Sequence, residues 1–587
     1  MKFLGLGLAL PALNSCDSLI EYFSNNENLE VNYDLEFKSP LGPFKSLEAN
    51  SLDELVLPEG YSYDIIRSYG DVILRVHEDH KNDENAEIGD GEQLQDGTAH
   101  NRASSRLRRT NDRSVPSVHE DHKDDENAEI GDCEQSPELK FGYNNDYIGF
   151  IPLSTDEALL AVNHEFLDPI DIPVEAEQRK AVGVSIIKIK KDSHGLWKFD
   201  EAHESQREFN RRITADTLCT VSGAVKELYP EMTGTLANCS GAVTPWNTVL
   251  TCEENYYLFD EVYKWKNFDA KQYGWIVEIN PLKPNSKPIK HTSLGRMAHE
   301  NCALVKSQDE RMVVYMGDDK ERQFIYKFVS KNPVNMPKNF KDTELEPHSS
   351  PFSEGDLYVA KLDKNLNFTE INSGKGKWLK LSIDNSILKS KFKSQAELLI
   401  ETRLAAKYLG ATPMDRPESL SVSPKDGSIV AALTYSPLQK NNFGSLFRIV
   451  EDESHSESMT FHYENLILGG KASGFACPDN IYFDKNSNLW LATDIDGANL
   501  NKAPYDFQGN NSLFVIPSEG PHAGKALRFA SAPAGAEFCG ISFSEDYKTL
   551  FLSVQHPGEG GLQSKWPHGT HAPKSSLVAI YQELEWW

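Results

Sequence analysis

One pattern recurs six times along the chain and limits what it can fold into. Each copy has a run of alternating apolar residues, a polar turn and a second alternating run, which together predict a β-hairpin. In the last three copies the first strand begins at Leu420, Ile481 and Ile541, at intervals of 61 and 60 residues. Hairpins repeated in this way are typical of a β-propeller, in which each repeat forms one blade. We therefore predict an all-β protein built on a six-bladed β-propeller.

Ionisable residues and a cysteine stand at the ends of these hairpins. The residues before the first strand and after the second strand share one end of the hairpin, so six blades in a ring would direct them toward one axis. The positions before the first strands are Asn144, Asn145, Asp146, Cys239, His299, Glu300, Arg416, Glu418, Asp479 and Glu537. The positions after the second strands are His164, Glu165, Glu253, Glu254, Asp318, Asp319, Asp494, Asp496 and His556.

Carboxylates dominate both sets, and oxygen ligands of this kind favour hard cations, calcium above all. A thiolate among them would add a transition metal such as ferric iron, which would also lower the pKa of the thiol. Carboxylates that converge without cations repel one another. The pattern therefore predicts either a metal cluster or a much wider ring.

Some of these residues have a simpler structural interpretation. Asp494 and Asp496 are typical of turns, and Glu253 and Glu254 are adjacent, so only one can point inward from a strand. Several cysteines fit buried apolar positions better than ligand positions: Cys252, Cys302, Cys477 and Cys539. Acidic residues at the same edge of three blades are the hardest to explain as core residues: Glu300, Glu418 and Glu537.

Composition and apolar patterning divide the 587 residues into four predicted regions. Residues 1–16 resemble a secretory or lipoprotein leader ending at Cys16, which predicts export by an uncertain route and leaves lipid attachment open. Residues 17–75 are expected to add N-terminal strands to the propeller. Residues 76–135 contain a duplicated acidic segment, VHEDHK, and are expected to be a disordered insertion. Residues 136–587 are expected to form the catalytic propeller, with a helical insertion at about 378–410.

Composition excludes some classes of function. A formal charge of −28 argues against nucleic-acid binding, and no run is long and apolar enough to span a bilayer. The eight cysteines form no CxxC pair. The chain also lacks the P-loop, the Rossmann glycine pattern, the GxSxG nucleophile elbow and the HExxH helix.

Several motifs, taken together and in order, resemble the PhoX family of alkaline phosphatases. They run from Phe141 to about Trp566 and include FGYNNDYIGFIPL, NHE, NCSGAVTPWNTVLTCEEN, GWIVEINP, GRMAHE, MDRPE, CPDN and AEFCG. The resemblance implies a six-bladed propeller and a phosphomonoesterase whose active site holds ferric iron and calcium. It also implies small phosphate monoesters as substrates, in a phosphate-scavenging role, and we expect a monomer.

Carried over motif by motif, the resemblance implies roles for particular residues. Cys239 would be the thiolate ligand of iron, with Cys252 as the alternative. Arg416 would grip the phosphate oxygens, because a guanidinium can bind them in a bidentate manner, and Glu418 would act beside it as a catalytic residue and ligand. The remaining implied metal ligands are Glu165, Glu254, Glu300, Asp479, Asp494 and Glu537.

The chain departs from the family in three places. Its leader lacks twin arginines, Ala242 stands where the family commonly has a glycine, and the duplicated insertion is particular to this sequence. Two other functions remain open: a calcium-only propeller hydrolase, such as a lactonase or phosphotriesterase, and a propeller that serves as a non-enzymatic binding scaffold. A calcium-only enzyme needs no thiolate, and a scaffold gives no reason for inward-facing glutamates.

Overall fold

The computed structural model of the chain describes residues 36–75, 138–334, 350–364, 368–452, 456–569 and 572–583. The predicted leader (1–16) and the predicted acidic insertion (76–135) lie outside the described residues. Residues 36–74 and those from Glu138 onward belong to one compact unit.

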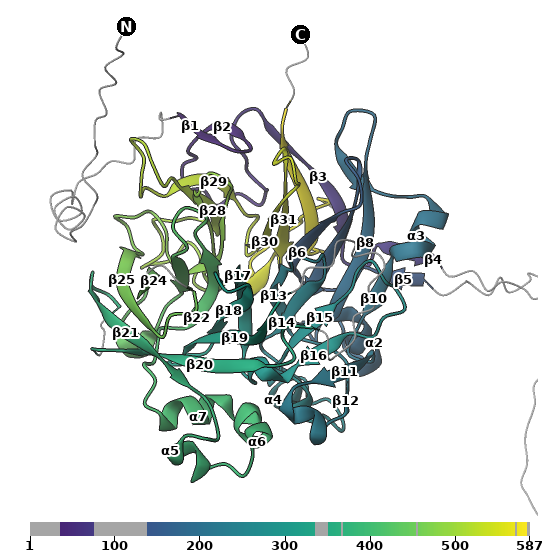
Figure 1. Ribbon diagram of the computed structural model, residues 1–587. Coiled ribbons are helices and arrows are strands. Elements are labelled where there is room, and N and C mark those ends of the chain that lie inside the picture. The colour runs from purple at the N-terminus through teal and green to yellow at the C-terminus, as the bar shows by residue number, and fades with distance from the viewer. Residues whose placement is uncertain are drawn as a thin grey trace, which may run out of the picture. The chain divides into compact units, whose positions relative to one another are not determined.

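All six predicted hairpins are present, and each is an antiparallel pair. The first strands of the pairs are β6 (Asn145–Pro152), β13 (Asn238–Val243), β17 (His299–Lys306), β22 (Pro417–Val422), β26 (Pro478–Phe483) and β30 (Glu537–Phe543). The second strands are β7 (Glu157–His164), β14 (Val249–Glu253), β18 (Arg311–Asp318), β23 (Ile429–Leu433), β27 (Leu489–Thr493) and β31 (Thr549–Gln555). Consecutive first strands lie against one another, so the hairpins form a ring (Figure 1).

Outer strands complete each blade, and among the described residues the architecture is the predicted six-bladed propeller. The outer strands are β8 (Gly183–Lys191), β9 (Trp197–Phe199), β10 (Arg211–Ile213), β11 (Leu218–Ser222), β12 (Glu231–Thr233), β15 (Ile276–Ile279), β16 (Ile289–His291), β19 (Ile325–Pro333), β20 (Gly355–Leu362), β21 (Ser373–Lys380), β24 (Ser445–Glu451), β25 (Thr460–Leu468), β28 (Ser512–Ile516) and β29 (Leu527–Ser531). The pairing of β21 with β25 joins the third and fourth blades into one nine-stranded sheet.

The sixth blade is assembled from both ends of the chain. Strand β3 (Tyr61–Ser68) pairs antiparallel with the last strand, β32 (Ser576–Gln582), which pairs in turn with β31. This exchange closes the ring, because the blade is completed by hydrogen bonds between segments more than 500 residues apart. The remaining N-terminal strands are β1 (Glu36–Ser39), β2 (Gly42–Lys45) and β4 (Val72–Arg75), the last of which pairs with β5 (Glu138–Lys140).

The helical insertion is shorter than predicted. Its helices are α5 (Ser386–Lys389), α6 (Gln395–Ile400) and α7 (Thr402–Tyr408), while residues 378–380 belong to β21. Trp378 explains the difference, because its buried ring packs against Phe461 at 5.0 Å and its backbone pairs with Ala360. Side-chain packing onto a sheet therefore outweighs the helical spacing of the apolar residues at this point.

Short helices fill the other connections. They are α2 (Glu175–Ala181), α3 (His203–Phe209), α4 (Leu258–Glu261), η1 (Ala224–Glu227), η2 (Ala270–Gln272), η3 (Thr292–Leu294), η5 (Pro437–Gln439) and η7 (Glu559–Gly561). No described helix has the length and apolar character needed to cross a membrane.

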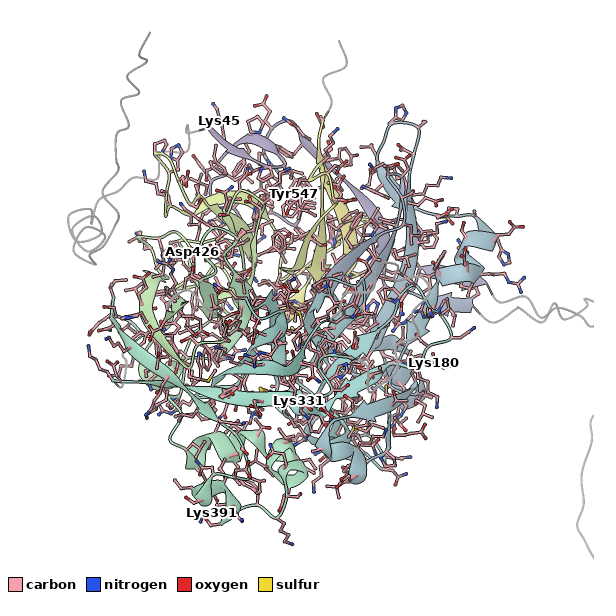
Figure 2. All side chains as sticks on the ribbon, in the orientation of Figure 1. Lys45, Lys180, Lys331, Lys391, Asp426 and Tyr547 are labelled. Carbon is pink, nitrogen blue, oxygen red and sulfur yellow. The ribbon has the colours of Figure 1, made fainter. Side chains whose placement is uncertain are left out.

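The apolar core lies between the blades. Several clusters draw on neighbouring blades. Trp490 of the fifth blade, for example, packs with Phe529 of its own blade at a ring distance of 5.3 Å and with Phe543 of the sixth blade at 5.2 Å. Charged side chains such as Lys180 and Lys391 lie at the periphery (Figure 2). Packing between sheets fixes each blade relative to the next, which sets the positions of the residues at the hairpin ends.

Candidate metal centre

A β-bulge places one residue of each of five blades at the axis. The hydrogen-bond register shifts after the first residue of the inner strand, for example between Asn145 and Ile148 and between Asn238 and Gly241. The same shift occurs in β17, β22 and β26. A bulge bends the strand and re-aims a side chain. The residues that open the five bulges are Asp146, Cys239, Glu300, Glu418 and Asp479, all at most 8% exposed.

A second set of residues follows the second strand of each hairpin. In five blades the backbone N–H of this residue donates to the carbonyl that precedes the first strand, at 2.8–3.2 Å. These five residues are Glu165, Glu254, Asp319, Thr434 and Asp494. Four of the accepting carbonyls belong to non-glycine residues with positive φ, namely Asn144, Ala237, Arg416 and Cys477. Such strained backbone is costly and clusters at functional sites, so its recurrence at this edge is a functional signal.

The sixth blade departs from this plan. Its register shift falls between Cys539 and Ser542, so the residue that opens its bulge is Gly540, with φ +63°. Both strands then continue for two more residues, to Glu537 and Gln555. The predicted equivalence of Glu537 with Glu300 and Glu418 is therefore wrong, because the equivalent residue is Gly540 and Glu537 lies three residues before it.

The thiol of Cys239 lies among carboxylates. Its Sγ is 2.9 Å from Oε2 of Glu300 and 3.5 Å from Oδ2 of Asp146. The amide of Gln555 donates to both Asp146 and Glu165, at 3.1 and 3.2 Å. The sulfur therefore faces two carboxylates from different blades, with no positive side chain bonded to any of the three among the described residues.

The donor atoms of these residues are close enough to share metal ions. Three groups have atoms within 4.8 Å of one another. They are Asp146 with Glu165 and Cys239, Cys239 with Glu254 and Glu300, and Glu300 with Glu418 and Asp479. Cys239 and Glu300 each belong to two groups, so the groups form one continuous cluster.

Two further observations fit a bound cation. Oδ1 of Asp146 and Oε1 of Glu300 are buried and lack a hydrogen-bond partner among the described residues, which is costly unless a ligand completes them. Burial and the neighbouring carboxylate of Glu165 raise the pKa of Asp146 to about 8. Burial and surrounding carboxylates likewise raise the pKa of Cys239, Glu300 and Glu418 well above their usual values. The site therefore stabilises positive charge at its centre.

Arg416 stands at the edge of the cluster. Its Nε and Nη2 donate to the two carboxylate oxygens of Asp319 at 2.8 and 2.6 Å, and Nη2 is 3.0 Å from Oε1 of Glu418. The guanidinium lies 4.8 Å from the ring centre of Tyr435 and its side chain is 24% exposed. It is therefore oriented by two carboxylates and partly exposed to solvent.

A fourth group lies beside the extended sixth blade. Asp494, Glu537 and His556 bring donor atoms within 4.8 Å of one another, and Nε2 of His556 lies 2.9 Å from Oε1 of Glu537. Glu559, whose Oε2 accepts from the Gly497 backbone at 2.9 Å, lies 3.8 Å from the other ring nitrogen of His556. Burial lowers and the surrounding carboxylates raise the pKa of His556, and the carboxylates prevail.

The structure shows which members of the paired candidates from the sequence lie at the cluster and which lie elsewhere. Cys252 lies in the apolar core and not in the cluster, so the geometry favours Cys239 as a ligand. Glu253 forms a buried ion pair with Lys290 at 2.7 Å, which leaves Glu254 to face the axis. Asp496 is an exposed turn residue whose side chain accepts from the Ala498 backbone.

Two residues were not selected as ligands from the sequence. Asp146 follows two asparagines, and the hairpin pattern did not indicate which of the three opens the bulge. Aligning the second residue of the first five inner strands would have found it. His556 stood among the hairpin-end residues, and its signal is its position directly after β31.

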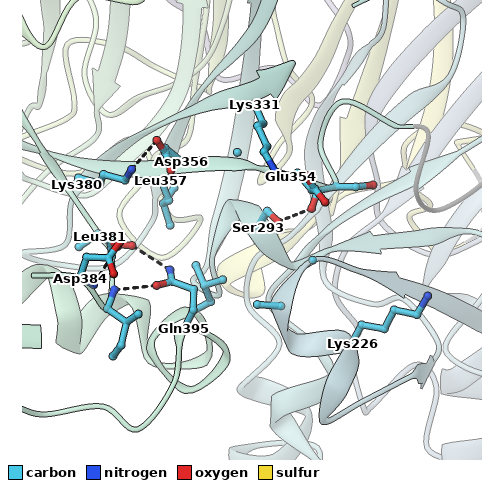
Figure 3. A pocket seen from close by; sticks show the side chains of 17 residues that line it. Lys226, Ser293, Lys331, Glu354, Asp356, Leu357, Lys380, Leu381, Asp384 and Gln395 are labelled. Carbon is cyan, nitrogen blue, oxygen red and sulfur yellow. Dashed lines mark hydrogen bonds and ion pairs between the residues drawn. The ribbon is translucent and has the colours of Figure 1, made fainter. Parts of the chain in front are cut away.

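Among the described residues, cavities outside the cluster include one beside the helical insertion and one between the inner strands. One, of about 660 Å³, is bordered by η1, β20 and the helical insertion (Figure 3). Four of its charged groups form ion pairs, Lys331 with Glu354 at 2.9 Å and Lys380 with Asp356 at 2.7 Å. The other, of about 420 Å³, is lined by the six inner strands and reaches Asn301 and Asn480 next to the cluster.

Comparison with known proteins shows one matching family and several similar solved structures. The family described as alkaline phosphatase PhoX matches residues 122–558. Pseudomonas fluorescens PhoX, solved in complex with vanadate as a transition-state analogue, shares 30% sequence identity and a TM-score of 0.73, covering 93% of this chain and 98% of its own. A protein of unknown function from Dyadobacter fermentans shares 8% identity at a TM-score of 0.35, covering 75% and 97%. No curated protein sequence matches the chain.

Proposed function

The chain belongs to the PhoX family of alkaline phosphatases and is a phosphomonoesterase, and from that premise we propose that it works through a cluster of ferric iron and calcium ions. The observation that carries the proposal is the Cys239 thiol, which lies 2.9 Å from Glu300 within a ring of buried carboxylates. A thiolate suits a transition metal, whereas carboxylates suit calcium.

The donor types divide the cluster into two parts. Cys239, Asp146 and Glu300 surround the sulfur and would hold iron. The all-oxygen positions would hold calcium: Glu165, Glu254, Glu418 and Asp479. Asp494, Glu537 and His556 would hold a further ion beside the sixth blade. When bound, such metals polarise phosphoryl oxygens and lower the pKa of a coordinated water.

Arg416 would bind and orient the substrate phosphate. Asp319 and Glu418 occupy its Nε and Nη2 edges, while the partly exposed remainder of the guanidinium can donate to phosphate oxygens. Phosphoryl transfer depends mainly on positioning and on neutralising charge. Asp319 and Glu418 would fix the direction of the guanidinium, so their contribution to catalysis includes orienting Arg416.

The proposal extends to substrate and location. Small phosphate monoesters fit an active site that binds the phosphate group through metals and one arginine. We propose an exported, monomeric enzyme with a phosphate-scavenging role. A calcium-only propeller hydrolase would use similar carboxylates, but the position of Cys239 at the centre of the cluster favours the iron-containing enzyme.

Metal content and activity measured on one purified sample test this proposal. Iron and calcium should both be present, and hydrolysis of p-nitrophenyl phosphate should disappear on chelation and return when both metals are restored. Calcium without iron in a fully active sample would support the calcium-only hydrolase instead. Activity that survives complete removal of both metals would overturn the proposal.

A further inference from the structure

The asparagine side chains that directly follow two of the bulge-opening residues join neighbouring blades at their bulges. Asn480, which follows the bulge-opening residue Asp479, is 4% exposed. Its Nδ2 donates to Oδ2 of Asp479 at 3.1 Å, and its Oδ1 accepts from the Gly540 backbone of the sixth blade at 3.1 Å. One side chain therefore contacts both a ring carboxylate and the backbone of the bulge on the next blade.

Asn301 has the corresponding position in the third blade, directly after Glu300. Its Nδ2 donates to Oγ of Ser240 in the second blade at 3.1 Å. Its Oδ1 accepts from the Leu420 backbone in the fourth blade at 3.3 Å. Asn301 thus links the bulges on both sides of its own.

Similar contacts cross the other three blade boundaries. Ser553 of the sixth blade donates to the carbonyl of Asp146 at 2.6 Å. Asn163 of the first blade donates to the carbonyls of Cys239 and Ser240 at 2.6 and 3.1 Å. The hydroxyl of Ser421 accepts from the Phe483 backbone at 3.3 Å. Together with the contacts of Asn301 and Asn480, these bonds form a closed belt, with one or more at every blade boundary.

We propose that Asn480 is a positioning residue that sets the geometry of the metal cluster, and that this belt is the means by which the six blades share one register. The proposal rests on the metal-dependent function proposed above. Apolar packing already holds the blades together farther out, but such packing does not orient a carboxylate. The amide of Asn480 occupies one oxygen of Asp479 and leaves the other for a cation. Hydrogen-bond partners of metal ligands act in this way and affect metal affinity.

The experiment compares Asn480→Ala and Asn480→Asp with the unaltered full chain. The aspartate variant keeps an acceptor for the Gly540 N–H but cannot donate to Asp479, so it separates ligand orientation from blade contact. The measurements are bound metal per chain after dialysis at a fixed low calcium concentration, and the calcium concentration that gives half-maximal activity. We expect both variants to need roughly 10-fold more calcium or more, the range typical of such partners.

Asn465→Ala provides the matched control. Asn465 is also buried, at 1% exposed, and donates to the carbonyls of Phe368 and Glu370 at 2.8 and 3.0 Å, but it lies on the outer strand β25. It should lower the unfolding temperature without changing the calcium requirement.

Three outcomes are informative. A higher calcium requirement in both Asn480 variants and not in the control supports the proposal. Wild-type calcium binding in Asn480→Asp, or in both variants despite a lower unfolding temperature, overturns it. An unaltered chain that binds no metal contradicts the metal-dependent function itself, which is a separate failure. If Asn480→Ala does not fold, the Asp variant decides, since it keeps the contact with the Gly540 backbone and loses only the bond to Asp479.

Discussion

Five blades and the sixth use the same hairpin differently. In the first five, a bulge opens with a potential ligand, from Asp146 to Asp479. In the sixth the equivalent residue is Gly540, because a β-carbon there would lie 2.4 Å from the carbonyl oxygen of Asp146. The sixth blade instead extends two residues farther and carries Glu537 and His556. A repeated backbone unit can therefore supply a ring of ligands, while one irregular copy makes room for the ring and adds a separate group beside it.

The largest expected effect comes from removing the sulfur shared by two donor groups. Cys239→Ala should lose iron and lower activity by more than about 100-fold, beyond the range typical for residues that only support a ligand. The buried Cys252→Ala is the matched control, since it removes a thiol from the apolar core. It should keep its iron and activity, at a cost of about 1 kcal/mol in stability. Metal analysis and p-nitrophenyl phosphate hydrolysis of both variants make the comparison, and full activity without Cys239 contradicts its role.

Gly540→Ala tests whether the irregular sixth blade makes room for the ring. The new methyl group would press on the Asp146 backbone at a site with positive φ, so we expect roughly 10-fold lower activity and a lower unfolding temperature. Gly410→Ala is the control, because Gly410 also has a positive φ, of +70°, but nothing within 4 Å of a β-carbon. It should cost about 1–2 kcal/mol of stability and leave activity unchanged. Equal activity loss in the two variants would mean that backbone strain alone is responsible.

The sequence predicted the repeating unit better than its details. Alternating apolar residues and polar turns are local signals, so the six hairpins and their return strands follow from them. The residue that opens each bulge depends on hydrogen-bond register between strands, which the alternation does not encode. This is why Asp146 was not distinguished from Asn144 and Asn145, and why Glu537 was placed level with Glu300. The joining of β21 to β25 was also out of reach, because it pairs segments separated by a whole hairpin.

Glu537→Gln probes the sixth blade's own group. This change removes a charge from the Asp494, Glu537 and His556 group and leaves the Cys239 side of the cluster unaltered. We expect roughly 10-fold more calcium to be needed for half-maximal activity, with unchanged iron content and near-normal activity at saturating calcium. Glu300→Gln is the comparison, since it should reduce iron as well. Iron loss in Glu537→Gln would show that the two parts of the cluster are not independent.

The smallest effect expected is a pH dependence that separates Asp146 at the axis from Asp494 beside the sixth blade. Burial and Glu165 raise the pKa of Asp146 to about 8, whereas the pKa of Asp494 rises only to about 6, because His556 and Arg416 oppose the effects of burial and Glu559. A raised carboxyl pKa means that the folded chain binds protons more tightly than the unfolded chain, so chelated protein loses stability as pH rises from about 4 toward these values. The loss of stability due to Asp494 should be complete near pH 6, and the loss due to Asp146 should continue to about pH 8.

Thermal unfolding of the chelated enzyme should therefore show a further fall in the unfolding midpoint between pH 6 and 8. This fall should shrink in Asp146→Asn and persist in Asp494→Asn, and restoring the metals should remove it, because bound cations stabilise the ionised carboxylates at every pH in this range. A midpoint that stays level between pH 6 and 8 after chelation would mean that Asp146 is already ionised, and that the contrast between Asp146 and Asp494 does not exist.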